Sequence, residues 1–304
     1  IKVSDEILKQ ISDAYRKIRN TIRYFLGNLS DFDPALHTVP HRDLPELDRW
    51  ALAKFNELRT RVIESYEKYE FHSIYQGLNY FCGTTMSAFY LDILKDRLYT
   101  AGTDSHLRRS AQTALYEILD GMLRLMSPIL CFTAAEAWNA LHGLEEKDSV
   151  ERGIHFVEFP PESEIECDEP MMEKWAKLIK IRSEITKALE NGRREKVIGH
   201  PLEAEVLIRA EGDLAEFMRG EWDTIKEISI ISEMSVLRDD TPVAGIRFVS
   251  EEIAGMIIQV QPASGEKCLR CWTRSTTVGE IAAHPEICRR CADVLATMKL
   301  HTEE

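Results

Sequence analysis

The sequence predicts a mainly α-helical protein in which a helical bundle precedes a small α/β module and a four-cysteine knuckle. Apolar residues recur every three or four positions through most of residues 1–145, the pattern of helices that bury one face. After Pro160 and Pro161, short β-like runs replace this period. Four cysteines then form two close pairs near the C-terminus. We expect three domains, at residues 1–160, 161–262 and 263–304.

The first predicted helix covers residues 4–29, with Ser4 as its N-cap. Its polar side carries Arg16, Arg19 and Arg23 at positions i, i+3 and i+7, so the three cations form a stripe on one face. Such a stripe is typical of phosphate contacts, although a solvated helix face has the same pattern. The opposite, apolar face consists of Ile7, Ile11, Ala14, Ile18, Ile22, Phe25 and Leu29.

The remaining helices of the bundle follow from the same periodicity. Three prolines predict a loop over residues 31–45, and a second helix is predicted for 46–68. An aromatic-rich helical segment over 71–94 is expected to break near Gly83, and a further helix covers 104–126. Thr133 is the predicted cap of the last helix, which extends to residue 141.

The predicted α/β module begins with a helix over residues 171–191 that Gly192 ends. Two β-like runs follow, at 203–209 and 227–236, on either side of a small helix near 214–218. A third run at 256–260 leads into the cysteine region.

Composition and charge exclude some classes of function. Of the 304 residues, no apolar run approaches the roughly 18 to 20 that cross a bilayer, and no signal peptide is recognised, so we expect no membrane partner. The net charge of −13 does not exclude nucleic acid, because phosphate binding depends on local basic patches. The chain begins with Ile1 rather than methionine, which predicts a processed protein or a piece of a longer one.

The cysteines predict a metal site rather than disulfides. Seven cysteines, an odd and clustered set, are typical of a reduced, cytoplasmic protein. Cys82, Cys131 and Cys167 stand alone and are predicted to be buried small hydrophobic residues rather than catalytic thiols.

The paired cysteines are Cys268, Cys271, Cys288 and Cys291, with sixteen residues between the pairs. This spacing predicts one structural Zn²⁺ with a filled tetrahedral shell and no open position for catalysis. Lys267, Arg270, Arg289 and Arg290 are placed to offset the charge of four thiolates on zinc. The knuckle also provides cations and a stacking face for nucleic acid, from Arg270, Trp272, Arg274, Arg289 and Arg290. A purely structural knuckle remains an alternative.

No active site is predicted within the chain. Asp92 and Asp96 resemble a carboxylate pair for acid–base chemistry, but Lys95 and Arg97 beside them favour a salt-bridge network between helices. Neither a glycine-rich phosphate loop nor a nucleophile elbow is present.

Several strings together resemble the C-terminal part of bacterial isoleucyl-tRNA synthetases. In the bundle they are SDEIL (4–8), YRKIRNTIRYFLGNL (15–29), DFDP (31–34), DRWAL (48–52), YEFH (69–72), FYLDILKDRLYT (89–100) and SPILCFTAAEAW (127–138). The string GEKCLRCW (265–272), with the second cysteine pair, resembles the zinc knuckle of the same enzymes. The resemblance covers nearly the whole chain and is weakest over about 160–262.

The resemblance implies the anticodon-binding bundle, junction module and zinc knuckle of a class I ligase that joins isoleucine to tRNA(Ile) in protein biosynthesis. In that family ATP and Mg²⁺ act in a catalytic domain whose signature motifs, HIGH and KMSKS, do not occur here. This chain alone is therefore expected to be inactive and to bind tRNA(Ile) as a monomer. The resemblance makes Arg270 and Trp272 candidates for base contacts, and Arg16, Arg19 and Arg23 candidates for backbone contacts.

Two other functions remain open from the sequence. Formamidopyrimidine-DNA glycosylases have a similar four-cysteine finger that binds duplex DNA, but they use an N-terminal proline that this chain lacks. A protein-interaction scaffold stabilised by zinc is the other alternative. Anticodon-dependent binding of tRNA would argue against both.

Overall fold

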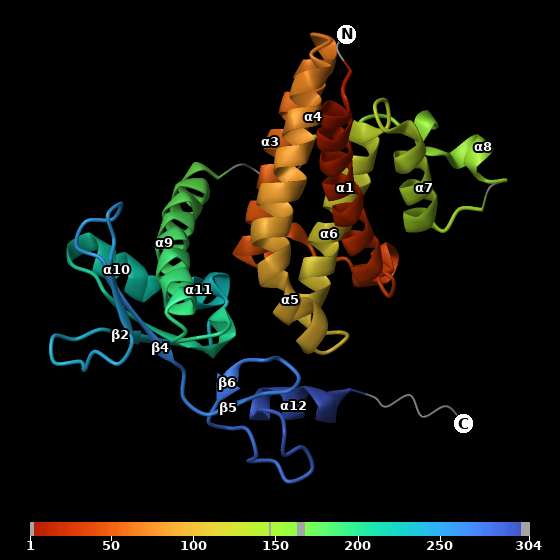
Figure 1. Cartoon of the computed structure of the whole chain (residues 1–304). Coiled ribbons are helices and arrows are strands. Elements are labelled where there is room, and N and C mark those ends of the chain that lie inside the picture. The colour runs from red at the N-terminus through yellow and green to blue at the C-terminus, as the bar shows by residue number, and fades with distance from the viewer. Residues whose placement is uncertain (1–2, 146, 163–167, 299–304) are drawn as a thin grey trace. The chain divides into compact units, whose positions relative to one another are not determined.

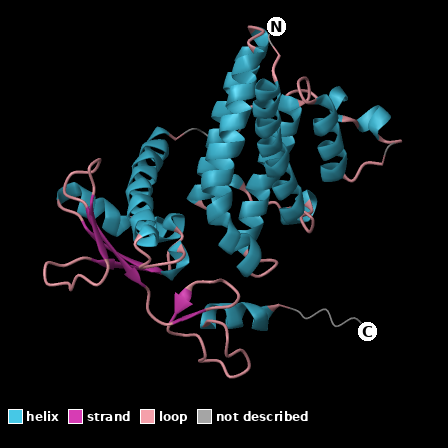
Figure 2. Cartoon of the chain, in the orientation of Figure 1, coloured by secondary structure: helices cyan, strands magenta, loops and turns pink. Residues whose placement is uncertain are grey.

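A computed structural model describes residues 3–145, 147–162 and 168–298 of the chain. The chain divides into two compact units, residues 1–99 with 103–168, and residues 169–304 with 100–102. The first unit is helical, and every strand of the described residues lies in the second (Figures 1 and 2). The predicted class, mainly helical with a small sheet and a cysteine cluster, is confirmed. The predicted domain boundaries at 160 and 262 stay predictions.

Long helices of the first unit pack side by side around an apolar core (Figure 1). Among the described residues, no helix is long and apolar enough to span a membrane. The elements are α1 (Asp5–Asn28), α2 (Pro34–His37), η1 (His41–Asp43), α3 (Glu46–Glu67), α4 (Phe71–Tyr80), η2 (Phe81–Tyr90), α5 (Leu91–Thr100), α6 (His106–Met126), α7 (Cys131–His142), α8 (Ser149–Arg152) and η3 (Ile154–Phe156).

Helix α1 begins as predicted, because the Ser4 hydroxyl accepts a hydrogen bond from the amide of Ile7 at 3.3 Å. Its predicted apolar face is only partly correct. Burial starts at Ala14, whereas Ile7 and Ile11 are 40% and 52% exposed. The periodicity is continuous in sequence, but the first turns of α1 are not covered by other described residues.

The predicted break near Gly83 is wrong. Helix α4 continues without interruption into η2, a π-helix, and then into α5. The wider π turns are accommodated by polar contacts: the Ser87 hydroxyl donates to the carbonyl of Cys82 at 2.7 Å and lies 3.2 Å from the Thr21 hydroxyl of α1. Cys82 is fully buried as predicted, Cys131 is only partly buried, and Cys167 lies outside the described residues.

Two further local predictions need correction. The loop over 31–45 contains a helical turn, α2, because Asp33 caps it and Pro34 occupies its first position. Thr133 is not the cap of α7, which already begins at Cys131. Its hydroxyl instead lies 3.0 Å from that of Tyr15 and so links α7 to α1.

A buried ion pair joins α3 to the end of α5. Asp48 is fully buried, accepts a hydrogen bond from the Tyr90 hydroxyl at 2.7 Å, and lies 3.2 Å from the guanidinium of Arg97. Arg97 therefore connects two helices, whereas Lys95 and Asp92 pair within α5 at 2.7 Å. Burial and the negative charge of Asp48 raise the pKa of Tyr90, which keeps its hydroxyl a donor.

In the second unit, α9 and α11 pack together, and α9 lies against strands β3 and β4 (Figure 1). The sheet order is β2-β1-β4-β3, with β1 and β2 parallel and the other pairs antiparallel. The elements are α9 (Glu169–Arg194), η4 (Pro201–Glu203), β1 (Ala204–Arg209), α10 (Gly212–Gly220), α11 (Trp222–Ser229), β2 (Glu233–Val236), β3 (Ile246–Val249) and β4 (Ile257–Pro262).

The sequence misplaced the end of α9 and part of the sheet. Gly192 does not end the helix but lies buried within it, where an added Cβ would meet Val260 at 3.1 Å. The run predicted as a strand at 227–236 is helix up to Ser229 and strand only from Glu233. Strand β3 was not predicted from the sequence. It has only four residues, of which Ile246 and Phe248 are partly buried, so its alternating apolar pattern is too short to recognise.

The knuckle consists of a short hairpin, β5 (Glu266–Lys267) and β6 (Arg274–Ser275), followed by α12 (Arg289–Thr297). Gly265 enters the hairpin with φ +77°, where a Cβ would lie 2.3 Å from the backbone of Ser275. Ser232, which precedes β2, connects the hairpin to the sheet. Its hydroxyl donates to the carbonyl of Leu202, before β1, and accepts from the amide of Arg274 in β6.

Candidate metal centre and nucleic-acid interface

The four paired cysteines meet in the core of the knuckle. Their sulfur atoms all lie within 4.8 Å of one another, and all four residues are buried. The Sγ atoms of Cys271 and Cys288 are 3.8 Å apart, too far for a disulfide. That separation fits zinc, because tetrahedral Zn–S bonds of about 2.3 Å place neighbouring sulfur atoms about 3.8 Å apart. The predicted ligand set is thus brought together in a geometry that fits one zinc ion.

Nearby donors favour the thiolate of one of the four cysteines, Cys268. Burial raises the pKa of Cys268, but amide donors from Cys271, Cys288 and Arg270 outweigh it and lower that pKa to about 6. Burial raises the pKa of Cys288 and Cys291. Because zinc binds thiolates, a bound cation would supply the stabilisation that these two buried sulfur atoms lack.

Trp272 occupies a conformation that favours glycine. Its φ is +66°, its amide donates to the carbonyl of Cys268 at 2.9 Å, and its side chain is 57% exposed. A large side chain in the left-handed region lowers stability, and an exposed ring regains little by burial. Lys267 lies 5.3 Å from the centre of the ring. The position of Trp272 therefore suits stacking on an external partner.

The cations predicted around the cluster have different surroundings. Burial raises the pKa of Cys291, and the nearby guanidinium of Arg270 offsets part of that rise. Arg289 pairs with Glu280 at 2.8 Å. The assignment of Arg270 to a base contact stays a prediction.

The three arginines of α1 lie on its solvent face. At 100° per residue, Arg16, Arg19 and Arg23 fall within about 60° of one another, opposite the side that buries Ile18 and Phe25. All three are exposed, and Arg16 pairs only loosely with Asp13 at 3.3 Å. The predicted stripe thus exists as a surface feature, and its contact with phosphates stays a prediction.

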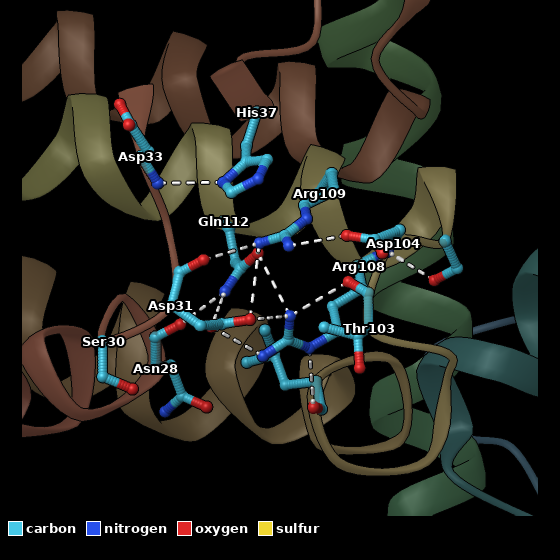
Figure 3. Close-up of polar contacts among 12 residues, drawn as sticks. Asn28, Ser30, Asp31, Asp33, His37, Thr103, Asp104, Arg108, Arg109 and Gln112 are labelled. Carbon is cyan, nitrogen blue, oxygen red and sulfur yellow. Dashed lines mark hydrogen bonds and ion pairs between the residues drawn. The ribbon is translucent and has the colours of Figure 1, made fainter. Parts of the chain in front are cut away.

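Another group of cations in this unit is already neutralised by acidic partners (Figure 3). Arg108 makes two hydrogen bonds to the Asp31 carboxylate, at 2.7 and 2.9 Å, and Arg109 contacts Asp104 at 2.8 Å. The hydrogen bonds of Arg108, with that of Gln112, outweigh burial and lower the pKa of Asp31 to about 2. This cluster holds the start of α6 to the end of α1, which distinguishes it from the exposed stripe.

Comparison with known proteins identifies the class. Residues 48–208, more than half of the chain, match the family described as "Anticodon-binding domain of tRNA ligase". The chain therefore belongs to the family of tRNA ligase anticodon-binding domains. Residues 265–294, which contain the four cysteines, match the "Zinc finger found in FPG and IleRS".

The curated relatives narrow this class, because over its whole length the chain is similar to proteins named isoleucine–tRNA ligase. It is 59% identical over 303 residues to that of Desulfotalea psychrophila, an alignment covering 100% of this chain and 32% of the relative. It is 48% identical over 296 residues to that of Syntrophotalea carbinolica, covering 97% and 31%. The chain thus spans about a third of the length of the curated relatives that it matches.

Proposed function

We propose that this chain is the tRNA-recognition region of an isoleucine–tRNA ligase and that it binds the anticodon arm of tRNA(Ile). The observation that carries the proposal is the order of two matched modules in one chain, an anticodon-binding bundle followed by a four-cysteine finger of the type found in IleRS. A glycosylase finger without the bundle would not account for residues 48–208.

In this proposal the bundle positions the RNA by its phosphates. Arg16, Arg19 and Arg23 present three exposed cations on one side of α1, about 5 to 10 Å apart along the axis at 1.5 Å per residue. The pair of Arg16 with Asp13 is exposed and therefore weak, so a phosphate can replace Asp13 at small cost.

The knuckle reads unstacked bases. One structural zinc ion, held by the four thiolates, keeps the turn that displays Trp272 rigid, and the indole offers a face on which an anticodon base stacks. Arg270, from the same turn, is the candidate for a base edge, although its interaction with the thiolate cluster limits its reach. A filled zinc shell has no position for water, so this metal serves folding rather than catalysis.

The whole ligase would use ATP, Mg²⁺ and isoleucine in parts of the relatives that this chain does not match. The chain by itself is therefore expected to form no aminoacyl-tRNA. We also expect it to be a cytoplasmic monomer.

The test is binding of the zinc-loaded chain to three labelled probes at one salt concentration: tRNA(Ile), the same tRNA with a replaced anticodon, and a DNA duplex. Preference for the native anticodon is expected. Preference for the duplex would favour a glycosylase-type finger, and no binding to any probe would favour a scaffold.

The arginine stripe has a matched control in the same unit. Replacing Arg16, Arg19 and Arg23 together by Gln should weaken binding to all RNA sequences alike and lower the slope of log K against log salt. In a second triple variant, Gln replaces three cations outside the stripe, Arg42, Lys54 and Lys95. This variant should change neither the affinity for RNA nor the salt slope. Equal effects of the two triples would assign the binding to net charge alone.

A further inference from the structure

A cationic pocket lies within the second unit where α9 ends. It encloses about 830 Å³ and is open to solvent. Its wall includes Val197, Ile198 and Pro262, but its charged lining is mainly basic. The charged residues are Arg193, Arg194, Lys196 and Arg274, with Glu190 and Glu203.

Both acidic residues of the pocket are already engaged. Glu190 pairs with Arg193 at 3.0 Å. Glu203 accepts hydrogen bonds from the amides of Gly199 and His200, at 2.8 and 3.3 Å, and these bonds fix its carboxylate against the wall. Arg194 contacts Asn191 and Glu195, at 3.0 and 3.7 Å. Lys196 is therefore the lining cation most available to an anion from outside.

Lys196 occupies the position where a helix end favours glycine. The amide of Val197 donates to the carbonyl of Gly192 at 2.9 Å, which closes the last turn of α9, and Lys196 between them has φ +60°. Glycine is the usual residue at this left-handed position, because a Cβ there lowers stability. Lys196 is exposed, and no ion pair to it occurs among the described residues, so contacts within the fold do not account for a lysine here.

The pocket is connected to Trp272 by two cations of the knuckle hairpin. Lys267 and Arg274 are direct partners across β5 and β6. Lys267 lies over the Trp272 ring at 5.3 Å, whereas Arg274 lines the pocket and donates to the carbonyl of Gly265 at 3.1 Å. Lys267 and Arg274 thus link the exposed indole to the pocket.

We propose that this pocket binds the ribose-phosphate backbone of RNA beside a base stacked on Trp272, with Lys196 contacting a phosphate. The inference rests on the proposed function and adds a second contact with the RNA. This contact is to the backbone and does not depend on the RNA sequence. In single-strand binding sites, bases stack on an aromatic ring while cations follow the backbone, which is the arrangement proposed here.

The competing explanation is that the basic residues only stabilise α9, since cations near a helix C-terminus interact favourably with its dipole. The variant Lys196→Gly separates the two explanations. Glycine removes the ammonium group and also the left-handed strain, so the fold should be as stable as before or more stable, while an RNA contact would be lost.

The experiment titrates the zinc-loaded full chain with a labelled anticodon stem-loop of tRNA(Ile) at several salt concentrations. Lys196→Gly is expected to weaken binding several-fold and to lower the slope of log K against log salt by about 0.7, the value for one phosphate contact on a single strand. Lys196→Arg should keep both the affinity and the slope. Arg247→Gln removes an exposed cation of β3 outside the pocket and should change neither.

The outcomes are distinguishable. If the wild-type chain does not bind the stem-loop at any salt, the proposed function fails and this inference with it. If the wild type binds and Lys196→Gly keeps its affinity and slope, the pocket is not a backbone site. A lowered unfolding temperature of Lys196→Gly with a proportional loss of binding would also overturn the inference. Stabilisation of the wild type but not Lys196→Gly by inorganic phosphate, with equal RNA affinities, would assign the pocket to a free anion instead.

Discussion

The helical unit and the zinc knuckle bury different kinds of side chain. On α6, Ile118, Leu119 and Met122 are completely buried within a continuous apolar core. Among the described residues of the knuckle, the buried cluster consists of the four cysteines, with the partly buried Val278 and Ile287 packed against it. Apolar burial therefore stabilises the first region. The second buries few apolar side chains, and in our proposal zinc–thiolate bonds stabilise it. Different perturbations should unfold the two regions separately.

The largest expected effect is on the knuckle. Cys288→Ser removes one of four zinc ligands, and loss of a structural zinc site removes on the order of 10 kcal/mol of folding free energy. The knuckle should unfold, with zinc released and proteolytic cleavage appearing within 265–298. The helical circular dichroism of the bundle should persist.

Cys131→Ser is the matched control, since this partly buried cysteine of α7 lies outside the metal centre. It should retain zinc and resist cleavage in the knuckle. Loss of most helical signal in Cys288→Ser would contradict the separation of the two regions.

The second largest effect is expected in the bundle, with the knuckle left intact. Asp48→Ala leaves the Arg97 guanidinium and the Tyr90 hydroxyl buried without their shared partner, which should lower the free energy of unfolding by about 3 to 5 kcal/mol. Urea unfolding followed at 222 nm measures it, and bound zinc should be unchanged. Asp92→Ala, which breaks an exposed pair with Lys95, should lower the unfolding free energy by less than about 1 kcal/mol.

The sequence predicted periodic and short-range features well, but not contacts between distant residues. Cysteine spacing predicted which four sulfur atoms come together, and helical phase placed Arg16, Arg19 and Arg23 on one face, because both depend on local geometry. Asp48 was not recognised, since its partners lie 42 and 49 residues away.

Tertiary contacts also decided the backbone conformations that sequence patterns missed. Gly192 lies within α9, where Val260 leaves little room for a Cβ, and the chain passes through Gly83 as a π-helix rather than a break. The left-handed conformations of Lys196 and Trp272 arise from a helix end and a cysteine turn, so neither is evident from residue type. Trp272 was chosen from its chemistry, whereas the pocket around Lys196 was missed.

A smaller effect tests whether the knuckle also serves recognition. Trp272→Gly relieves the left-handed strain and removes the stacking face, so binding of tRNA(Ile) should weaken by roughly 1 to 3 kcal/mol. Zinc content and thermal stability should be kept. Leu269→Ala, which truncates another exposed side chain of the same turn, is expected to leave affinity unchanged. Equal tRNA affinities of Trp272→Gly and wild type would leave the knuckle a structural element only.

The smallest effect concerns the polar cluster of the bundle and its response to acid. Because the folded pKa of Asp31 lies at about 2, below its ordinary value, its contribution is complete above about pH 5 and disappears as pH falls through about 2. The Asp31 side chain is 38% exposed, so solvent screening limits this contribution to about 1 kcal/mol. Asp31→Asn should therefore lower the bundle's unfolding free energy by that amount at pH 6, and the difference from wild type should shrink as the pH approaches 2. Glu57→Gln, in an exposed pair with Lys54, should have a smaller effect at pH 6, and a pH-independent difference for Asp31→Asn would show that packing rather than charge links α1 to α6.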